Sequence, residues 1–101
     1  MGRGFNEVVY KDALEIEFRQ NGIPFSRESS YPIKYKDVLL PHSYVADFVV
    51  FDLVLLELKA IECLTKAHEK QVLNYLAASR LRLGLLVNFG EPSLVSKRVI
   101  L

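Results

Sequence analysis

Two apolar segments lie next to each other in the middle of the chain, and they leave little freedom for the local fold. Residues 44–51 and 53–59 are largely apolar, and only Asp52 separates them. Two strand-like runs joined by so short a polar break are typical of a tight antiparallel hairpin. We therefore predict that these segments form two neighbouring strands of one sheet.

Two further segments have the pattern of helices. Residues 5–21 are rich in helix formers and carry two apolar stripes at helical spacing. Asn21-Gly22 ends this helix, because glycine accepts the left-handed conformation that closes one. Residues 64–79 are expected to form the second helix, with Leu73 and Leu76 on one side. Both helices would pack against the sheet that contains the hairpin.

The other segments are read as strands and connections. Residues 29–35 have weak strand character, and Pro32 within them suggests an edge or a bulge. Residues 83–89 form a nearly continuous apolar run, as expected in a sheet interior. Residues 97–101 could add a short last strand. Between the first two strands we expect a loop that holds Asp37, Pro41 and His42. The order of helix, three strands, helix and strand predicts an α/β fold with a mixed sheet flanked by two helices.

Composition limits the kind of protein further. The chain has 101 residues, 50% of them hydrophobic and 25% charged, which suits one packed domain over residues 1–101. Cys63 is the single cysteine, no apolar run could span a bilayer and no secretory signal is recognisable. We expect a cytoplasmic protein without a membrane partner. A net charge of +1 argues against a non-specific coat on DNA, but it suits an acidic site beside basic contacts.

Three charged residues interrupt the apolar hairpin. Because side chains alternate faces along a strand, Glu57 and Lys59 project from the same face of the second strand. Asp47 interrupts the first strand, as far from Asp52 as Glu57 is. The two carboxylates then lie opposite each other, with Cβ atoms roughly 5 Å apart. A lone Glu-x-Lys pair is more often a solvated strand end, but apolar residues surround all three charges and favour a site.

Two facing carboxylates repel each other unless a proton or a cation lies between them. A hard divalent cation such as Mg²⁺ fits, because it prefers oxygen ligands and keeps several waters. Lys59, on the face of Glu57, could orient or deprotonate a water, or stabilise charge that develops on a phosphate. The residues thus favour metal-assisted hydrolysis.

Five short motifs occur in order along the chain. They are Gly4-x-x-Glu7-x-x-Tyr10, Ala46-Asp47, Glu57-Leu58-Lys59, Gln71-x-x-x-Tyr75, and Gly84-Leu85-Leu86-Val87-Asn88-Phe89-Gly90. Together they resemble the GxxExxY proteins, which are small bacterial and archaeal members of the PD-(D/E)XK nuclease superfamily. The resemblance extends from Gly4 to Ile100. It implies a restriction-endonuclease-like core.

The resemblance also assigns roles around the metal. Asp47 and Glu57 would bind it, together with the backbone carbonyl of Leu58. Lys59 would be the catalytic lysine. Glu7 matches the acidic residue on the first core helix that completes the site in this superfamily. The implied cofactor is Mg²⁺ or Mn²⁺.

The second helix carries the remaining candidates. Gln71 and Tyr75 are four residues apart and share a helix face, which His68 extends. By resemblance to exonuclease-like relatives, Gln71 and Tyr75 would support the lysine and contact nucleic acid. Alternatively, Tyr75 packs against the sheet and Gln71 faces solvent. His68 is more often a capping or solvated histidine than a ligand.

These inferences predict a metal-dependent nuclease that hydrolyses phosphodiester bonds in DNA and acts on ends or single strands. RNA stays open as a substrate. Small members of this superfamily commonly dimerise, so the resemblance also implies a homodimer. A catalytically silent nucleic-acid-binding module is the rival hypothesis, followed by a regulatory subunit whose site works only inside a larger complex.

Overall fold

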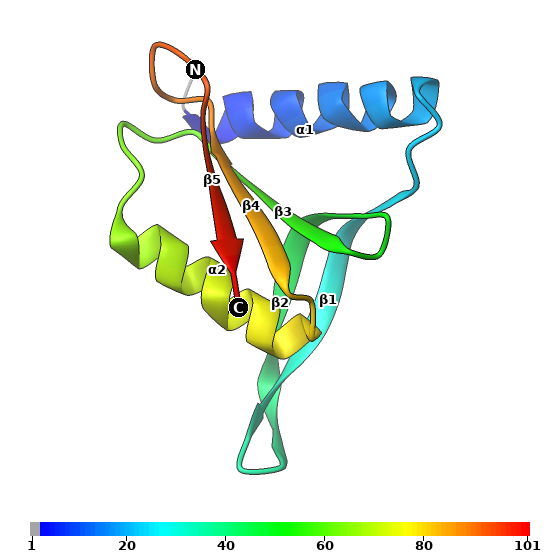
Figure 1. The fold of residues 1–101 in the computed structure, drawn as a ribbon, viewed down its shortest axis with the longest axis vertical. Coiled ribbons are helices and arrows are strands. Elements are labelled where there is room, and N and C mark those ends of the chain that lie inside the picture. Colours follow the sequence, from blue (N-terminus) through cyan, green and yellow to red (C-terminus); the bar gives the residue numbers. More distant parts are fainter. Residues whose placement is uncertain (1–2) are drawn as a thin grey trace.

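The computed structural model describes residues 3–101, which form two helices and one five-stranded sheet (Figure 1). The elements follow each other as α1 (Arg3–Gln20), β1 (Phe25–Tyr35), β2 (Val38–Val50), β3 (Val54–Lys59), α2 (Lys66–Ser79), β4 (Leu83–Asn88) and β5 (Val95–Ile100). The predicted α/β fold is confirmed. No helix within this described range is long and apolar enough to cross a membrane.

The strands lie in their sequence order across the sheet, β1-β2-β3-β4-β5. All neighbours are antiparallel except β3 and β4, which are parallel. A parallel pair needs a crossover connection, and α2 supplies it. The sheet is therefore mixed, and β5 is the short last strand that the sequence allowed for.

Each helix covers its own face of the sheet. On the α2 face, Leu55 and Leu86 from the central strands pack with Val72 and Leu76 of the helix. The fit is tight, since a Cβ added at Gly84 would come within 2.6 Å of the Val72 side chain. This close approach explains a glycine inside an apolar strand.

Aromatic rings dominate the opposite, α1 face. Phe18 of α1 lies 5.4 Å, centroid to centroid, from both Phe25 and Phe48. Tyr10 stacks on Phe89 at 4.3 Å. Such ring pairs stabilise a core beyond the area they bury. Tyr10 of the first motif therefore anchors α1 to the sheet.

The hairpin predicted around Asp52 is confirmed. Val50 pairs with Val54, and the Leu53 N–H donates to the Val50 carbonyl at 3.0 Å. Phe51 and Asp52 both have positive φ angles, 57° and 55°. Two successive positive φ values give the turn the twist that suits antiparallel strands.

The loop predicted between the first two strands is wrong. β2 begins at Val38, so Pro41 and His42 lie in a strand and only a turn at Lys36 and Asp37 remains. β3 pairs with β2 only from Phe48 onwards, which leaves the first part of β2 on an edge. Proline is tolerated there because β3 does not reach it, and because it falls in a register irregularity where no β1 residue is paired with it. Figure 1 shows this β1–β2 hairpin extending beyond the rest of the sheet.

Other boundaries shift by a few residues. α1 runs from Arg3 to Gln20 where residues 5–21 were expected, and β1 starts at Phe25, four residues before the expected start. α2 starts at Lys66, after its N-cap Thr65. The last strand is Val95–Ile100 where residues 97–101 were expected.

Candidate active site

Asp47 and Glu57 meet where β2 and β3 separate. The last backbone pair of these strands is Phe48 with Leu56, so the next step of the register places Asp47 opposite Glu57 as predicted. Their carboxylates replace the backbone partners lost there. The Asp47 N–H donates to Glu57 Oε1 at 3.3 Å, and the Leu58 N–H donates to Asp47 Oδ2 at 2.8 Å. Each carboxylate thus holds the strand of the other.

A break in the strand pattern opens this gap. Ala46 and Val49 are three residues apart yet both pack in the α2-face core, whereas regular alternation would put them on opposite faces. Across from Asp47, Glu28 of β1 adopts a left-handed φ of 57°. Both strands therefore change face at this point. This irregularity lets the Asp47 carboxylate reach residues on the α1 side of the sheet.

The two carboxylates are almost removed from solvent. Asp47 is 9% exposed and Glu57 is 4% exposed. Burial, followed by the charge of Asp47, raises the pKa of Glu57 to about 8. At neutral pH the pair holds a proton unless a cation replaces it. The expected facing carboxylates are thus present, and a cation that binds them has to displace this proton.

Lys59 reaches the pair from the α2 face. Its Nζ donates to Gln71 Oε1 at 3.3 Å, so helix α2 fixes the position of the ammonium group. The positive charge of Lys59 partly offsets the rise in the pKa of Glu57. The structure therefore brings Asp47, Glu57, Lys59 and Gln71 together.

Tyr75 lies next to this group and also packs. Its ring makes an edge contact with Tyr44, with centroids 4.2 Å apart. Burial raises the pKa of Tyr75, and the negative charges of Glu57 and Asp47 contribute. Tyr75 is thus close enough to the carboxylates for their charge to affect its pKa, while its ring packs against Tyr44 of the β1–β2 hairpin.

Lys11 of α1 is a site residue that sequence reasoning missed. Its Nζ lies 2.7 Å from Asp47 Oδ1 and 3.5 Å from Glu7 Oε1. Burial alone would lower the pKa of Lys11, but the hydrogen bond and charge of Asp47, then of Glu7, outweigh it and raise the pKa. Glu7 and Lys11 are four residues apart on a helix, which signals an ion pair. The contact with Asp47 depends on tertiary packing.

Glu7 joins the site through this lysine. The ion pairs run from Glu7 to Lys11 and from Lys11 to Asp47. The ammonium group of Lys11 and that of Lys59 approach the carboxylates from opposite faces of the sheet. Across residues 3–101, no group of three or more His, Cys, Asp or Glu side chains is already arranged to hold a metal.

The donor set nevertheless fits a hard divalent cation. Asp47 and Glu57 offer buried carboxylate oxygens at one point, and Lys11 already places positive charge against one of them. Mg²⁺ and similar ions prefer such oxygens. Lys11 thus occupies an Asp47 oxygen that a metal ion would also use.

Residues after β3 hold the end of that strand in place. The side-chain amide of Asn88 accepts the Ile61 N–H at 3.0 Å and donates to the Ile61 carbonyl at 2.9 Å. The Phe89 N–H donates to the Lys59 carbonyl at 2.9 Å. Gly90 packs directly on the backbone of Ile61, where a Cβ would clash. The motif at residues 84–90 therefore has a structural role beside the site.

His68 has a structural role as well. Its Nδ1 accepts the N–H of Thr65, the N-cap of α2, at 3.0 Å. Side chains that bond an N-cap backbone in this way stabilise the first turn of a helix. The capping alternative for His68 is thus the one that the structure supports.

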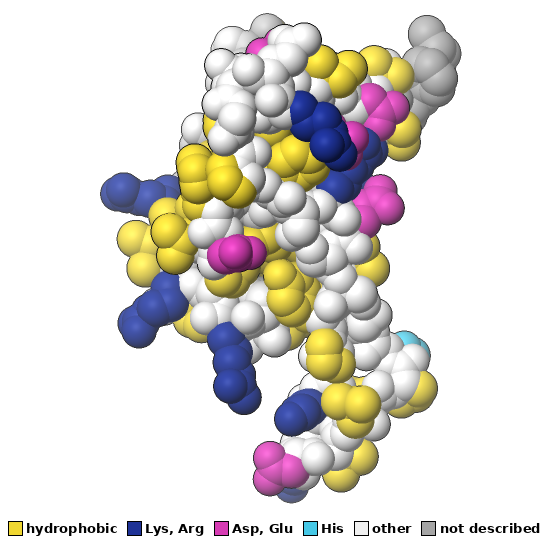
Figure 2. Space-filling view, turned by 90° about the vertical axis from the view of Figure 1, so that its right-hand side faces the viewer, with side chains coloured by type: hydrophobic (Ala, Val, Ile, Leu, Met, Phe, Trp, Pro, Cys, Tyr) yellow, Lys and Arg dark blue, Asp and Glu magenta, His cyan; other side chains and the backbone are white. Residues whose placement is uncertain are grey.

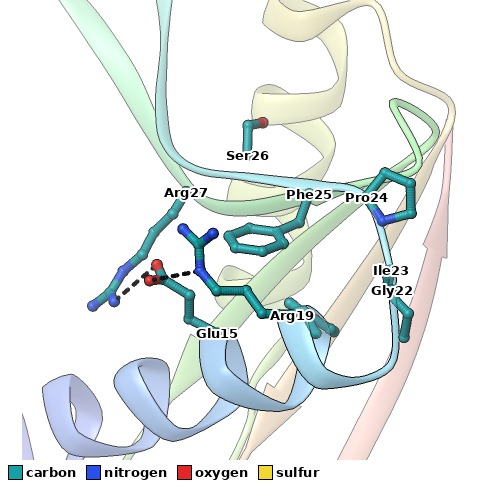
Figure 3. A pocket seen from close by; sticks show the side chains of 9 residues that line it. Glu15, Arg19, Gly22, Ile23, Pro24, Phe25, Ser26 and Arg27 are labelled. Atoms are coloured by element: carbon teal, nitrogen blue, oxygen red, sulfur yellow. Dashed lines mark hydrogen bonds and ion pairs between the residues drawn. The ribbon is translucent and has the colours of Figure 1, made fainter.

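A hollow without a link to these residues lies at the C-terminal end of α1 (Figure 3). Its volume is about 610 Å³. Its charges are paired with each other, since Glu15 lies between Arg19 at 3.5 Å and Arg27 at 3.5 Å. Arg27 also pairs with Asp12 at 2.7 Å. We assign this hollow no chemistry.

Comparisons with known proteins agree on fold. A family model described as the PD-(D/E)XK nuclease superfamily matches residues 1–99. The crystal structure of SSO0001 is similar with a TM-score of 0.72 and 17% identity, over 91% of this chain and 48% of that one. An alkaline exonuclease (LHK-Exo) from Laribacter hongkongensis is similar with a TM-score of 0.51 and 12% identity, over 91% of this chain and 54% of that one. The chain thus spans about half the length of each structure. No curated protein matches the sequence.

Proposed function

The chain belongs to the PD-(D/E)XK nuclease superfamily, and we propose that it is a metal-dependent nuclease that hydrolyses phosphodiester bonds in DNA. The superfamily predicted from the motifs is therefore confirmed, while the GxxExxY branch stays a prediction. One observation carries the proposal: the buried pair of Asp47 and Glu57 lies beside Lys59, which Gln71 holds. Fold alone would not support a reaction.

Asp47 and Glu57 would hold the cation, which we propose to be Mg²⁺ or Mn²⁺. The Leu58 carbonyl is the third proposed ligand. Its N–H already points to Asp47, and in a strand the N–H and C=O of one residue point to the same neighbour. When bound, the cation would supply Lewis-acid stabilisation of the negative charge that develops on the phosphate.

The chain's own residues would do the remaining work. The Lys59 ammonium would lie against the phosphate and stabilise its charge through Nζ–H donors. The Gln71 carbonyl oxygen accepts one of these hydrogens and so restricts where Nζ can lie. Holding a catalytic group in place in advance lowers the entropic cost of reaction. Burial of the carboxylates limits bulk water at the reacting centre.

The position of Tyr75 supports the proposal that the substrate is a DNA end or single-stranded DNA. Its ring lies beside the carboxylates and is half-buried, and aromatic rings stack on unpaired bases. Tyr75 would then guide one strand past Lys59, which Gln71 holds in position. Use of RNA and formation of a homodimer stay predictions.

A second candidate function has one observation in its favour. Lys11 already neutralises Asp47 through a 2.7 Å ion pair. A lysine in that position could replace the metal altogether, which would leave a catalytically silent module that binds nucleic acid. The two candidates differ in whether a divalent cation displaces Lys11.

The test is cleavage of labelled single-stranded DNA, double-stranded DNA and RNA in Mg²⁺, Mn²⁺ or EDTA. Lys59→Met serves as the variant, because it keeps the length of the side chain and removes its charge. We expect metal-dependent cleavage of DNA by the wild-type protein and none by the variant. Wild-type protein that binds DNA but leaves it intact in every metal would support the silent module.

A further inference from the structure

A second hollow lies between the projecting β1–β2 hairpin and the C-terminal half of α2. Its volume is about 460 Å³, which is within the usual range of small-molecule sites. Lys34 and Tyr44 line it from the hairpin, and Asn74 and Arg80 line it from the helix end. The other lining residues are uncharged, so the hollow carries two cations and no carboxylate.

This hollow is next to the candidate active site. Tyr44 lines the hollow and contacts the ring of Tyr75. The pKa of Tyr75 is in turn raised by the charges of Glu57 and Asp47. Along α2, Gln71, Asn74 and Ala78 follow each other at helical spacing, so they lie on one face of the helix. At 1.5 Å per residue, Ala78 is roughly 10 Å beyond Gln71 along the axis. The route from Lys59 to the hollow is therefore short.

We propose that this hollow binds a nucleotide of the DNA strand whose phosphodiester bond lies at Lys59. Lys34 and Arg80 would contact its phosphate, and Tyr44 would stack on the base. The Asn74 amide offers a donor and an acceptor to base edges. An unpaired base fits this combination of aromatic ring and cations, whereas the stacked bases of a duplex would not enter.

This proposal rests on the proposed function, because only a nuclease that acts on DNA would place a DNA strand at Lys59. It adds a place outside the catalytic group where affinity for a single strand would arise. It also gives the β1–β2 hairpin a role: the part of the hairpin beyond the sheet forms one wall of the site. Figure 2 shows that this hairpin projects from the body of the protein and carries charged side chains.

The experiment measures binding of a fluorescein-labelled oligothymidylate by fluorescence anisotropy. Binding is measured in EDTA and again in Mg²⁺. For the Mg²⁺ series every protein also carries Lys59→Met, so that the oligonucleotide is not cleaved. The test variant is Lys34→Gln/Arg80→Gln. The control is Lys97→Gln/Arg98→Gln, which removes the same charge from β5, outside the hollow.

We expect the test variant to bind roughly tenfold more weakly, with a salt slope smaller by about 0.7, because each phosphate of a single strand that is neutralised contributes about 0.7. The control should bind within about twofold of wild type, since loss of distant exposed charge costs little. Tyr44→Phe should keep the affinity, and Tyr44→Leu should lower it at least about fivefold. Thermal unfolding would verify that each variant is folded.

Equal affinity of the test variant and wild type would overturn the proposal, and so would an equal loss in the control. Absence of strand binding by wild-type protein in both buffers would overturn it too. If the hollow variants lose binding but the wild-type protein never cleaves DNA, the nucleotide site stands and the nuclease does not. If all variants cleave and bind like wild type, the nuclease stands alone.

Discussion

Asp47 and Glu57 hold each other in place through the main chain. Glu57 accepts the N–H of Asp47 at 3.3 Å, and Asp47 accepts the N–H of Leu58, the neighbour of Glu57, at 2.8 Å. Both carboxylates are thus fixed without a metal. The site is preorganised, at the cost of burying two acidic groups side by side. This arrangement leads to the predictions that follow.

Two substitutions at Asp47 should separate stability from activity. Asp47→Ala removes the acceptor of the Leu58 N–H and leaves Lys11 with Glu7 as its remaining ion-pair partner, which should lower the free energy of unfolding by about 1–3 kcal/mol. Asp47→Asn keeps an acceptor oxygen and should lose less stability. Both should lose cleavage, because neither has the negative charge. Urea denaturation beside a cleavage assay measures this, and an active Asp47→Asn protein would contradict it.

Lys11 should compete with the divalent cation for Asp47. Lys11→Met removes the ammonium group that lies 2.7 Å from Asp47 Oδ1, so Mn²⁺ should bind more tightly. Isothermal titration calorimetry measures the affinity. Lys97→Met is the control, because Lys97 pairs with Glu69 away from the site. Weaker binding of Mn²⁺ to Lys11→Met would show that Lys11 organises the carboxylates instead.

The raised pKa of Glu57 predicts how stability changes with pH. Its pKa is about 8 in the folded protein, against 4.5 for an ordinary glutamate. Between these values the folded state keeps a proton that the unfolded chain has released, so raising the pH favours unfolding. In EDTA, the free energy of unfolding should decline from about pH 4.5 to about pH 8 relative to that of Glu57→Gln. Parallel stability curves for the two proteins would refute this.

Gln71 should act as a positioning residue for Lys59. Gln71→Met keeps the side-chain length but removes the oxygen that accepts from Lys59 Nζ at 3.3 Å. We expect kcat to fall roughly 10- to 100-fold with KM little changed, because a small displacement of a catalytic group has a large effect on rate. The urea midpoint should stay close to that of wild type. A change confined to KM would place Gln71 on the substrate and away from the lysine.

Much of the site could be predicted because it depends on strand geometry. Equal distance from Asp52 placed Asp47 opposite Glu57, and alternation placed Lys59 on the face of Glu57. These rules depend only on the period of a strand and on a short turn. Helical spacing placed Gln71 and Tyr75 on one helix face, whereas the contact of Gln71 with Lys59 was implied by the family resemblance.

Other features depend on tertiary contacts, which local sequence patterns do not predict. Lys11 reaches Asp47 across the place where β1 and β2 change face, next to Glu28 and Asp47, and no sequence period signals that change. The strand through Pro41 was missed because proline normally interrupts a sheet, and its tolerance here depends on β3 being short. The hollow beside Tyr44 arises from two elements that are far apart in sequence.

The most direct test of the central claim is cleavage of a linear, end-labelled single-stranded DNA by wild-type protein and Asp47→Asn, in Mg²⁺ and in EDTA. We predict that only the wild-type protein in Mg²⁺ produces shortened strands. Intact DNA in all four reactions, or cleavage that persists in EDTA or in Asp47→Asn, would contradict a nuclease whose metal is held by Asp47 and Glu57.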